Sequence, residues 1–290
     1  MFPVPNDGPA GRPGARRVAW MLAVSAASLL AGCAGNDAVS AFPAADREEH
    51  VPLFARQPYA PFSRADAVAI ALREWRLFGQ KVDDDPPGTK PSPPAGQKPE
   101  RMPGLWQRIG EYWWIGQNSD RREAGWTGQH DETGREFPAE QDEAYAWSAA
   151  FLSYVMRIAG AGSRFPYAPA HHTYINIARQ MSLGQTQGWA VVAERVDADA
   201  PQPGDIICAG RRLARRLRFE NLPTTKPFTA HCAIVVAIGE QLSVIGGNVD
   251  DAVTLTHVPT TADGRLAVVG GQPVDSRYPW FVVLRVLYDY

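Results

Sequence analysis

The fold is decided by one stretch, Tyr145-Ala-Trp-Ser148-Ala-Ala-Phe-Leu-Ser-Tyr-Val-Met-Arg-Ile-Ala-Gly160. Its apolar residues fall at positions 149, 152, 155, 156 and 159, which is the spacing of an amphipathic α-helix. Gly160 is a typical end for such a helix. Ser148 lies four residues before Leu152, so we expect its hydroxyl on the buried face of the first turn, at the positive end of the helix dipole.

Short apolar runs downstream of this helix predict a sheet. Three of them have polar residues at one end: Pro203-Gly204-Asp205-Ile-Ile-Cys208, His231-Cys-Ala-Ile-Val-Val-Ala-Ile238 and Val244-Ile-Gly-Gly-Asn248. Further strands are expected at residues 254–258, 266–269 and 280–287, and the last is apolar enough to lie centrally in the sheet. A short helix is expected from His171 to about Met181.

The order of these motifs resembles that of the NlpC/P60 and CHAP cell-wall hydrolases. Those enzymes carry a cysteine on the helix, a histidine on the second strand of the sheet and a polar residue on the next. The same run, with its Trp-Ser-Ala-Ala-Phe helix, His171 and Gly-Gly-Asn248, resembles still more closely the bacterial domain of unknown function 2272 family, from about Gly104 to the C-terminus. The resemblance implies a papain-like α+β fold, in which this helix packs on an antiparallel sheet. Here Ser148 occupies the cysteine position.

An acyl-transfer site needs a nucleophile, a base, a group that orients the base, and donors for the oxyanion. Ser148, His231 and Asn248 are candidates for the first three roles, and His171 is a second candidate imidazole. Each also has a structural interpretation, as a packed helix residue, a histidine satisfied by backbone, or a turn residue. No cofactor or metal is expected.

The resemblance, together with this site, implies two alternative functions. The first is an amidase or peptidase that cuts amide bonds in the peptides of peptidoglycan. The second is a catalytically inactive protein that binds wall fragments or a protein partner through the same groove. Both functions stay open because Ser148 stands in the cysteine position. A serine hydroxyl is far less acidic than a cysteine thiol, and its reactivity depends wholly on a well-placed base.

The N-terminus has the pattern of a signal peptide. Arg12, Arg16 and Arg17 precede an apolar run at 18–30 that is too short to span a membrane. Leu30-Ala-Gly-Cys33 resembles the lipobox of bacterial lipoproteins, which implies a signal peptide over residues 1–32 and a lipid-anchored Cys33. By the same resemblance, Ala34 favours the outer membrane, facing the periplasm. The alternative is a plain secretory signal.

The chain after the signal peptide is interpreted as three segments. Residues 33–62 are interpreted as a tether, residues 63–103 as a helix with a proline-rich linker, and residues 104–290 as the main domain. Ser63-Arg-Ala-Asp66 resembles a capping box and predicts a helix over 64–78. Seven prolines between Asp83 and Pro103 predict a segment too polar and proline-rich to pack.

The aromatic run around residues 110–115 and the basic run at 211–218 are less specific indicators of function than the motifs above. Residues 110–115 are expected to form a strand or an irregular segment, and the tryptophans around them to cover the core rather than to bind glycan. His130-Asp-Glu is a weak candidate for metal. The five arginines of 211–218 are typical of a solvated loop, although they can attract wall carboxylates or anionic lipid. A net charge of −2 gives no electrostatic case for binding nucleic acid.

Two thiols remain once Cys33 is lipidated. If the first two strands pair antiparallel, Cys208 lies opposite Cys232, and an oxidising compartment favours a disulfide between them. Because successive side chains alternate faces, we expect Cys232 to face away from the helix if His231 faces Ser148. The alternative is a pair of free buried cysteines.

Overall fold

The structure is a computed structural model that describes residues 60–266, 268–269 and 272–289. All of these residues belong to one compact unit. The predicted signal peptide, Cys33 and the predicted tether as far as residue 59 lie outside the described residues. Among the residues searched, none of the helices is both long and apolar enough to cross a membrane.

One antiparallel sheet of six strands forms the centre of this unit, in the order β1-β8-β2-β3-β4-β5. The coarse prediction of an α+β fold is therefore confirmed. The strands are β1 (Val191–Glu194), β2 (Ile206–Gly210), β3 (Ala230–Ile238), β4 (Leu242–Val249), β5 (Ala252–Val258) and β8 (Trp280–Val286). Val268–Val269 (β6) and Gln272–Pro273 (β7) pair separately as a two-stranded ladder.

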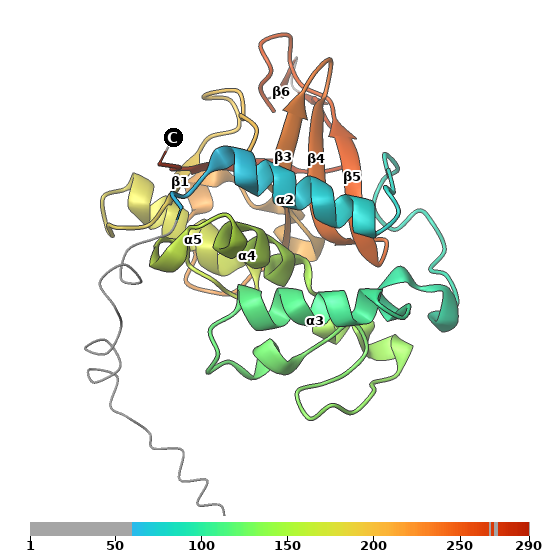
Figure 1. Cartoon of the computed structure of the whole chain (residues 1–290). Helices are drawn as coiled ribbons and strands as arrows, with labels where there is room; N and C mark the ends of the chain where they lie inside the picture. The colour runs from blue at the N-terminus through green and yellow to red at the C-terminus, as the bar shows by residue number, and fades with distance from the viewer. Residues whose placement is uncertain (1–59, 267, 270–271, 290) are drawn as a thin grey trace, which may run out of the picture. The chain divides into compact units, whose positions relative to one another are not determined.

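Three helices cover one face of the sheet. Figure 1 shows α2 crossing β3, β4 and β5, with α4 and α5 beside it, and α4 packs on β3 and β4. A further helix, α3, packs on α4. The α-helices are α2 (Arg64–Leu77), α3 (Leu105–Gly116), α4 (Ser148–Ile158) and α5 (His171–Ser182). Short 3₁₀-helices occupy Ala95–Gln97, Pro99–Arg101, Arg122–Gly125, Ala139–Tyr145, Gly162–Arg164, Arg212–Arg216 and Phe219–Asn221.

The predicted helices around the sheet are confirmed, with small shifts at their ends. The central helix begins at Ser148 itself, because the preceding residues form the 3₁₀-helix Ala139–Tyr145. The Ser63 hydroxyl accepts a hydrogen bond from the Asp66 N–H at 3.2 Å, as the capping pattern indicates. The other half of that capping box does not form, since the Ser63 N–H donates to the Ala159 carbonyl instead.

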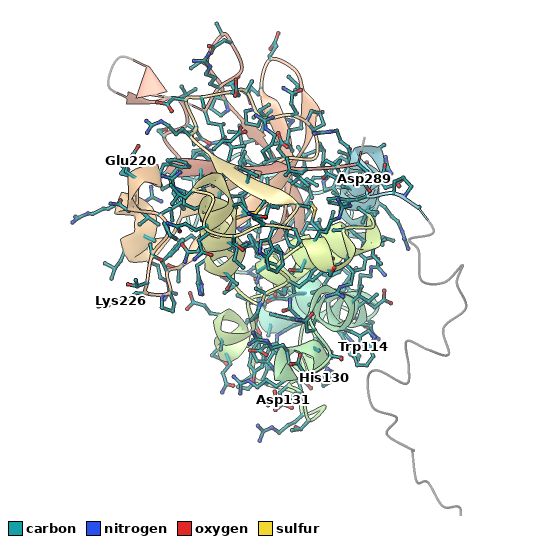
Figure 2. The ribbon with its side chains drawn as sticks, turned by 90° about the vertical axis from the view of Figure 1, so that its left-hand side faces the viewer. Trp114, His130, Asp131, Glu220, Lys226 and Asp289 are labelled. Atoms are coloured by element: carbon teal, nitrogen blue, oxygen red, sulfur yellow. A yellow bond between two sulfur atoms is a disulfide. The ribbon has the colours of Figure 1, made fainter. Side chains whose placement is uncertain are left out.

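The prediction for residues 110–115 is wrong, because they belong to helix α3. The buried residues of α3 are Ile109, Tyr112, Trp113 and Gly116, which is helical spacing. The helical period was hard to recognise in the sequence, because Gly110 and the aromatic residues around it are poor helix formers. The aromatic side chains do cover the core, except that Trp114 points outward on α3 and is 67% exposed (Figure 2).

The strands from Ile206 to Val258 lie close to their predicted positions, and three differences remain. β1 was not expected, because its four residues alternate only weakly in polarity. The strand expected at 266–269 is reduced to the two residues of β6. β8 is an interior strand, as its apolar sequence indicates, although it lies next to the edge strand β1.

The predicted disulfide is confirmed: Cys208 and Cys232 are bonded and lie opposite each other where β2 pairs with β3. The prediction that Cys232 faces away from the helix is wrong. Both cysteines lie in the core cluster that contains α4, whereas Ala233 and Val235 belong to the cluster on the other face. His231 reaches Ser148 nonetheless, because it is the second residue of β3 and stands at the end of the strand.

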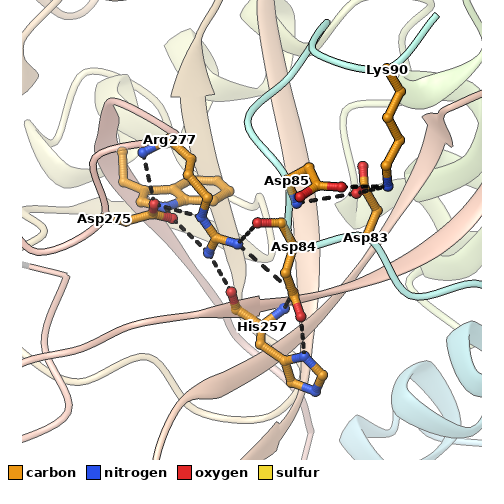
Figure 3. Close-up of polar contacts among 8 residues, drawn as sticks. Asp83, Asp84, Asp85, Lys90, His257, Asp275 and Arg277 are labelled. Atoms are coloured by element: carbon orange, nitrogen blue, oxygen red, sulfur yellow. Dashed lines mark hydrogen bonds and ion pairs between the residues drawn. The ribbon is translucent and has the colours of Figure 1, made fainter.

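Most of the proline-rich segment lies on the surface, as its composition indicates: residues 84–92 and 94–97 are exposed. Its acidic residues nonetheless have defined partners. Asp84 binds the N–H and ring of His257 on β5 and the Arg277 guanidinium in the loop before β8, and Asp83 pairs with Lys90 of the same segment (Figure 3). Val82 also forms a bridge with Leu255 of β5. Polar side chains with defined partners thus fix a segment that has too few apolar residues to pack by burial alone.

Candidate functional site

The first residue of α4 contacts two imidazoles from different elements. Ser148 Oγ lies 3.0 Å from Nδ1 of His231 on β3 and 2.9 Å from Nε2 of His171 at the start of α5. All three side chains are buried. The rings of His171 and His231 are nearly perpendicular, with their centroids 5.9 Å apart. Three residues that were singled out from the sequence therefore meet at one point.

Two glycines of β4 allow this close approach of sheet and helix. A Cβ atom on Gly247 would lie 2.6 Å from Cβ of Phe151 in α4. A Cβ on Gly246 would lie 2.7 Å from Nε2 of His231. The sequence interpretation placed this Gly-Gly pair in a strand that ends at Asn248, and both residues do lie within β4, which must approach its neighbours closely.

The donor and the acceptor of each hydrogen bond around Ser148 can be assigned. Tyr174 is fully buried, and its hydroxyl contacts only Nδ1 of His171 among the described residues. We assign the phenol as donor, since the alternative leaves a buried O–H unsatisfied. The Nε2–H of a neutral His171 then donates to Ser148 Oγ. The Ser148 hydroxyl is left to donate to Nδ1 of His231.

Electrostatics keeps both imidazoles neutral. Burial lowers the pKa of His231 to about 3, and the positive charge of Arg211 adds to the effect. Burial also holds the pKa of His171 well below its usual value, with smaller contributions from His231 and Arg211. A neutral His231 can accept a proton at neutral pH, but the same environment disfavours the imidazolium that would result.

Asn248 does not orient His231. It lies near the end of β4 with a φ of 57°, and within the part of the chain that the structure describes no hydrogen bond joins it to the ring. Gly246, rather than a polar side chain, is beside Nε2. Asn248 does line the cleft of about 610 Å³ that contains Ser148 and His171. It therefore belongs to the site as a wall of the cleft.

A residue of the proline-rich segment supports the start of α4. Trp147 donates from Nε1 to Oε2 of Glu100 at 2.8 Å, and Trp147 directly precedes Ser148. Glu100 is buried, its other oxygen has no hydrogen-bond partner among the described residues, and Lys98 Nζ is 3.7 Å away. Burial, and then the charge of Asp251, raises the pKa of Glu100 to about 8. No sequence pattern indicated this residue, because its role depends on tertiary contacts alone.

Glu100 should make stability depend on pH. Its folded-state pKa is raised, so between pH 4.5 and about 8 the folded chain keeps a proton that the unfolded chain releases. The free energy of unfolding should therefore fall as pH rises through this window, by at most roughly 1.4 kcal/mol per pH unit. Glu100→Gln mimics the protonated form and should remove this slope.

Urea unfolding at pH 5 and pH 8 tests the Glu100 prediction. The variant should match the parent at pH 5 and exceed it at pH 8. Glu140→Gln, at an exposed neighbour in the same cleft wall, serves as the control and should change neither value. A Glu100→Gln variant less stable than the parent at pH 8 would contradict the assignment.

The predicted metal candidate is not assembled. His130 and Asp131 lie together in a loop, labelled in Figure 2, where Asp131 binds Thr133 and Arg135. Throughout the described ranges no group of three or more His, Cys, Asp or Glu side chains is placed to hold a metal ion. His130 instead packs against the Trp106 ring.

A family model described as an uncharacterized protein conserved in bacteria (DUF2272) matches residues 100–286. The match covers more than half of the chain, and the chain therefore belongs to this family. It includes Ser148, His171, His231 and Asn248, and it begins at Glu100. Comparisons with curated proteins and with solved structures found no match.

Proposed function

We propose that this DUF2272 protein is an envelope hydrolase that cuts an amide bond in peptidoglycan peptides, with Ser148 as the nucleophile. One observation carries the proposal. Ser148, at the N-terminus of the buried helix α4, has its Oγ within hydrogen-bond distance of Nδ1 of a neutral His231. Nucleophile, base and helix dipole are then arranged as acyl transfer requires. The papain-like order of helix and strands supports the same proposal.

In this mechanism His231 acts as the general base. As Ser148 Oγ attacks the carbonyl carbon, its proton passes to Nδ1, and the leaving amine then takes that proton. The first backbone N–H groups of α4 have no partner within the helix, and Ala149 lines the same cleft. These N–H groups, together with the His171 Nε2–H, are the proposed donors to the oxyanion. Water then releases the acyl group from Ser148.

The second candidate is a protein that binds wall fragments without cutting them. It is favoured by the environment of His231: among the described residues no side chain forms a hydrogen bond with Nε2, and the pKa of His231 is about 3. Such a base stabilises its protonated form poorly. Binding would use the cleft of about 610 Å³ beside Ser148.

Digestion of purified peptidoglycan separates the two candidates. We expect the parent chain to release new amino groups and soluble peptides, and Ser148→Ala to release none while still binding peptidoglycan in a sedimentation assay. Equal binding without any release by the parent chain favours the inactive binder.

A substitution at Gly246 tests the geometry of the site without mutating any proposed catalytic residue. Gly246→Ala puts a Cβ 2.7 Å from His231 Nε2, so the ring must shift relative to Ser148. A misplacement of about 1 Å typically costs roughly 10²-fold in rate, and we expect a loss of that order. Gly239→Ala is the matched control, because its nearest atom is 3.7 Å away. Equal loss in both folded variants would contradict the role of Gly246.

The lipobox resemblance leads us to propose that the protein is lipid-anchored through Cys33, in the outer membrane facing the periplasm. Cys33→Ser should move the protein from the membrane fraction to the soluble periplasmic fraction, which fractionation and immunoblotting will measure. Ser40→Ala is a suitable control, since it changes a residue of the predicted tether without touching the lipobox or the Cys208–Cys232 disulfide. A Cys33→Ser protein that still floats with membranes would show that lipidation is not the anchor.

A further inference from the structure

We propose that Arg211 forms a carboxylate-binding subsite beside Ser148, so that the ligand carries a free carboxylate next to the bond held at the serine. The inference deepens the proposed function, and it rests on that function for the presence of a ligand in the cleft. It assigns a substrate class, namely peptides with a terminal or side-chain carboxylate near the reactive carbonyl.

Arg211 stands where three clefts meet. It lines the cleft of about 610 Å³ that contains Ser148 and His171. It also lines a cleft of about 290 Å³ onto which His231 opens, and a polar cleft of about 490 Å³ that reaches Glu100. Asn248 is the other residue common to all three. A group bound by Arg211 is therefore next to the serine, whichever cleft the rest of the ligand follows.

Three cations that line these clefts are already paired with carboxylates, whereas among the described residues Arg211 is not, and neither is Arg215, which lines only the cleft of about 290 Å³. Arg212 binds Glu143, Lys98 binds Asp142 at 2.6 Å, and Lys90 binds Asp83 at 2.5 Å. In the described part of the chain, the guanidinium of Arg211 has neither an ion pair nor a hydrogen bond. Of the carboxylates at the Ser148 cleft, Glu143 is taken by Arg212, and Glu140 is not within ion-pair distance of Arg211. An unpaired guanidinium facing a cleft is ready to accept a planar carboxylate in bidentate geometry.

The backbone of Arg211 is held firmly. Its N–H donates to the Thr229 carbonyl at 3.0 Å, and its carbonyl accepts from Thr229 Oγ1 and from the Ala214 N–H, both at 2.9 Å. The chain folds back sharply here, since a Cβ atom on Gly210 would lie 1.9 Å from the Ala214 carbonyl oxygen. A fixed backbone reduces the conformational entropy lost when the side chain binds a ligand.

A bound carboxylate would also change the electrostatics of the base. The charge of Arg211 disfavours protonation of both His231 and His171. A carboxylate paired with that guanidinium would offset its charge and make His231 a better proton acceptor. Ligands with the carboxylate are then expected to bind, and also to react faster than neutral analogues, which gives the subsite a role in specificity.

Binding of a matched pair of small molecules tests the subsite. N-acetylglycine and its neutral amide, N-acetylglycinamide, would be titrated into the purified full-length chain and followed by NMR signals of the histidine rings. We expect the carboxylate to bind at least tenfold more tightly than the amide, and Arg211→Met to abolish that preference. Arg216→Met is the control, because Arg216 belongs to the same loop but does not line the Ser148 cleft, and it should keep the preference.

The outcomes separate this inference from the proposed function. Carboxylate binding that depends on Arg211 in a chain that cuts nothing supports the subsite and contradicts the hydrolase. Equal affinity for acid and amide, or a preference that survives Arg211→Met, overturns the subsite even if peptidoglycan is cut. Equal loss in Arg211→Met and Arg216→Met also overturns it, since the effect is then one of overall loop charge.

Discussion

His231→Gln should lower the rate at which Ser148 is acylated by roughly 10²- to 10⁴-fold, the usual contribution of a general base. The reason is the 3.0 Å contact between Ser148 Oγ and Nδ1, which is the proton acceptor in the hydrogen-bond direction assigned above. The rate of reaction with an activated ester or a fluorophosphonate measures this. His172→Gln is the matched control, because His172 is the neighbour of His171 and does not line the Ser148 cleft.

The pH profile of the parent chain carries the same prediction. With a pKa of about 3, His231 stays neutral well below the ordinary histidine value of 6.5. The rate should therefore hold as pH falls from 8 to about 4, as long as the chain stays folded. A rate that falls with a midpoint near 6.5 would contradict the lowered pKa of His231. A His231→Gln variant as fast as the His172→Gln control would contradict its role as the base.

Glu74→Ala should lower the free energy of unfolding by about 3–5 kcal/mol, the typical cost of leaving one partner of a buried ion pair. Glu74 of α2 is fully buried, and its carboxylate accepts from Arg108 at 2.6 and 2.7 Å and from the Tyr112 hydroxyl at 2.8 Å. Arg108 also contacts the Tyr154 hydroxyl on α4. Removing the carboxylate leaves the Arg108 charge without its buried partner and the Tyr112 hydroxyl without its acceptor.

Glu111→Ala is the matched control for Glu74. Glu111 pairs with the same arginine but is exposed, so its loss should cost at most about 1 kcal/mol. Chemical denaturation of both variants measures the difference. Similar losses in the two variants would show that the buried network does not hold α2 to α3 and α4.

Local patterns predicted much of the fold. The spacing of apolar residues placed α4, and the capping pattern at Ser63 placed α2. The apolar runs placed β2 to β5 and β8, because these strands bury one clear face or are apolar throughout. The failures have physical reasons. Helix α3 buries glycine and large aromatic residues, which blur its period, and β1 is only four residues long.

The candidate site was predicted in part. The order of motifs brought Ser148, His171 and His231 into one hypothesis, and the structure places their side chains in contact. Their chemical roles stay predictions. Asn248 shows the limit of the approach, because a residue's position at a strand end does not fix the direction of its side chain. The roles of Glu100 and Gly246 could not be predicted from the sequence, since they come from contacts between distant segments.

The most direct test of the proposed chemistry is the site of a covalent adduct. The full-length chain would be treated with a fluorophosphonate at neutral pH, digested and mapped by mass spectrometry, with Ser148→Ala and Ser153→Ala in parallel. Ser153 is a matched control, since it is a buried serine of the same helix that does not line the Ser148 cleft. The account predicts one adduct on Ser148, lost in Ser148→Ala and kept in Ser153→Ala. A folded parent chain that carries no adduct at Ser148 would contradict it.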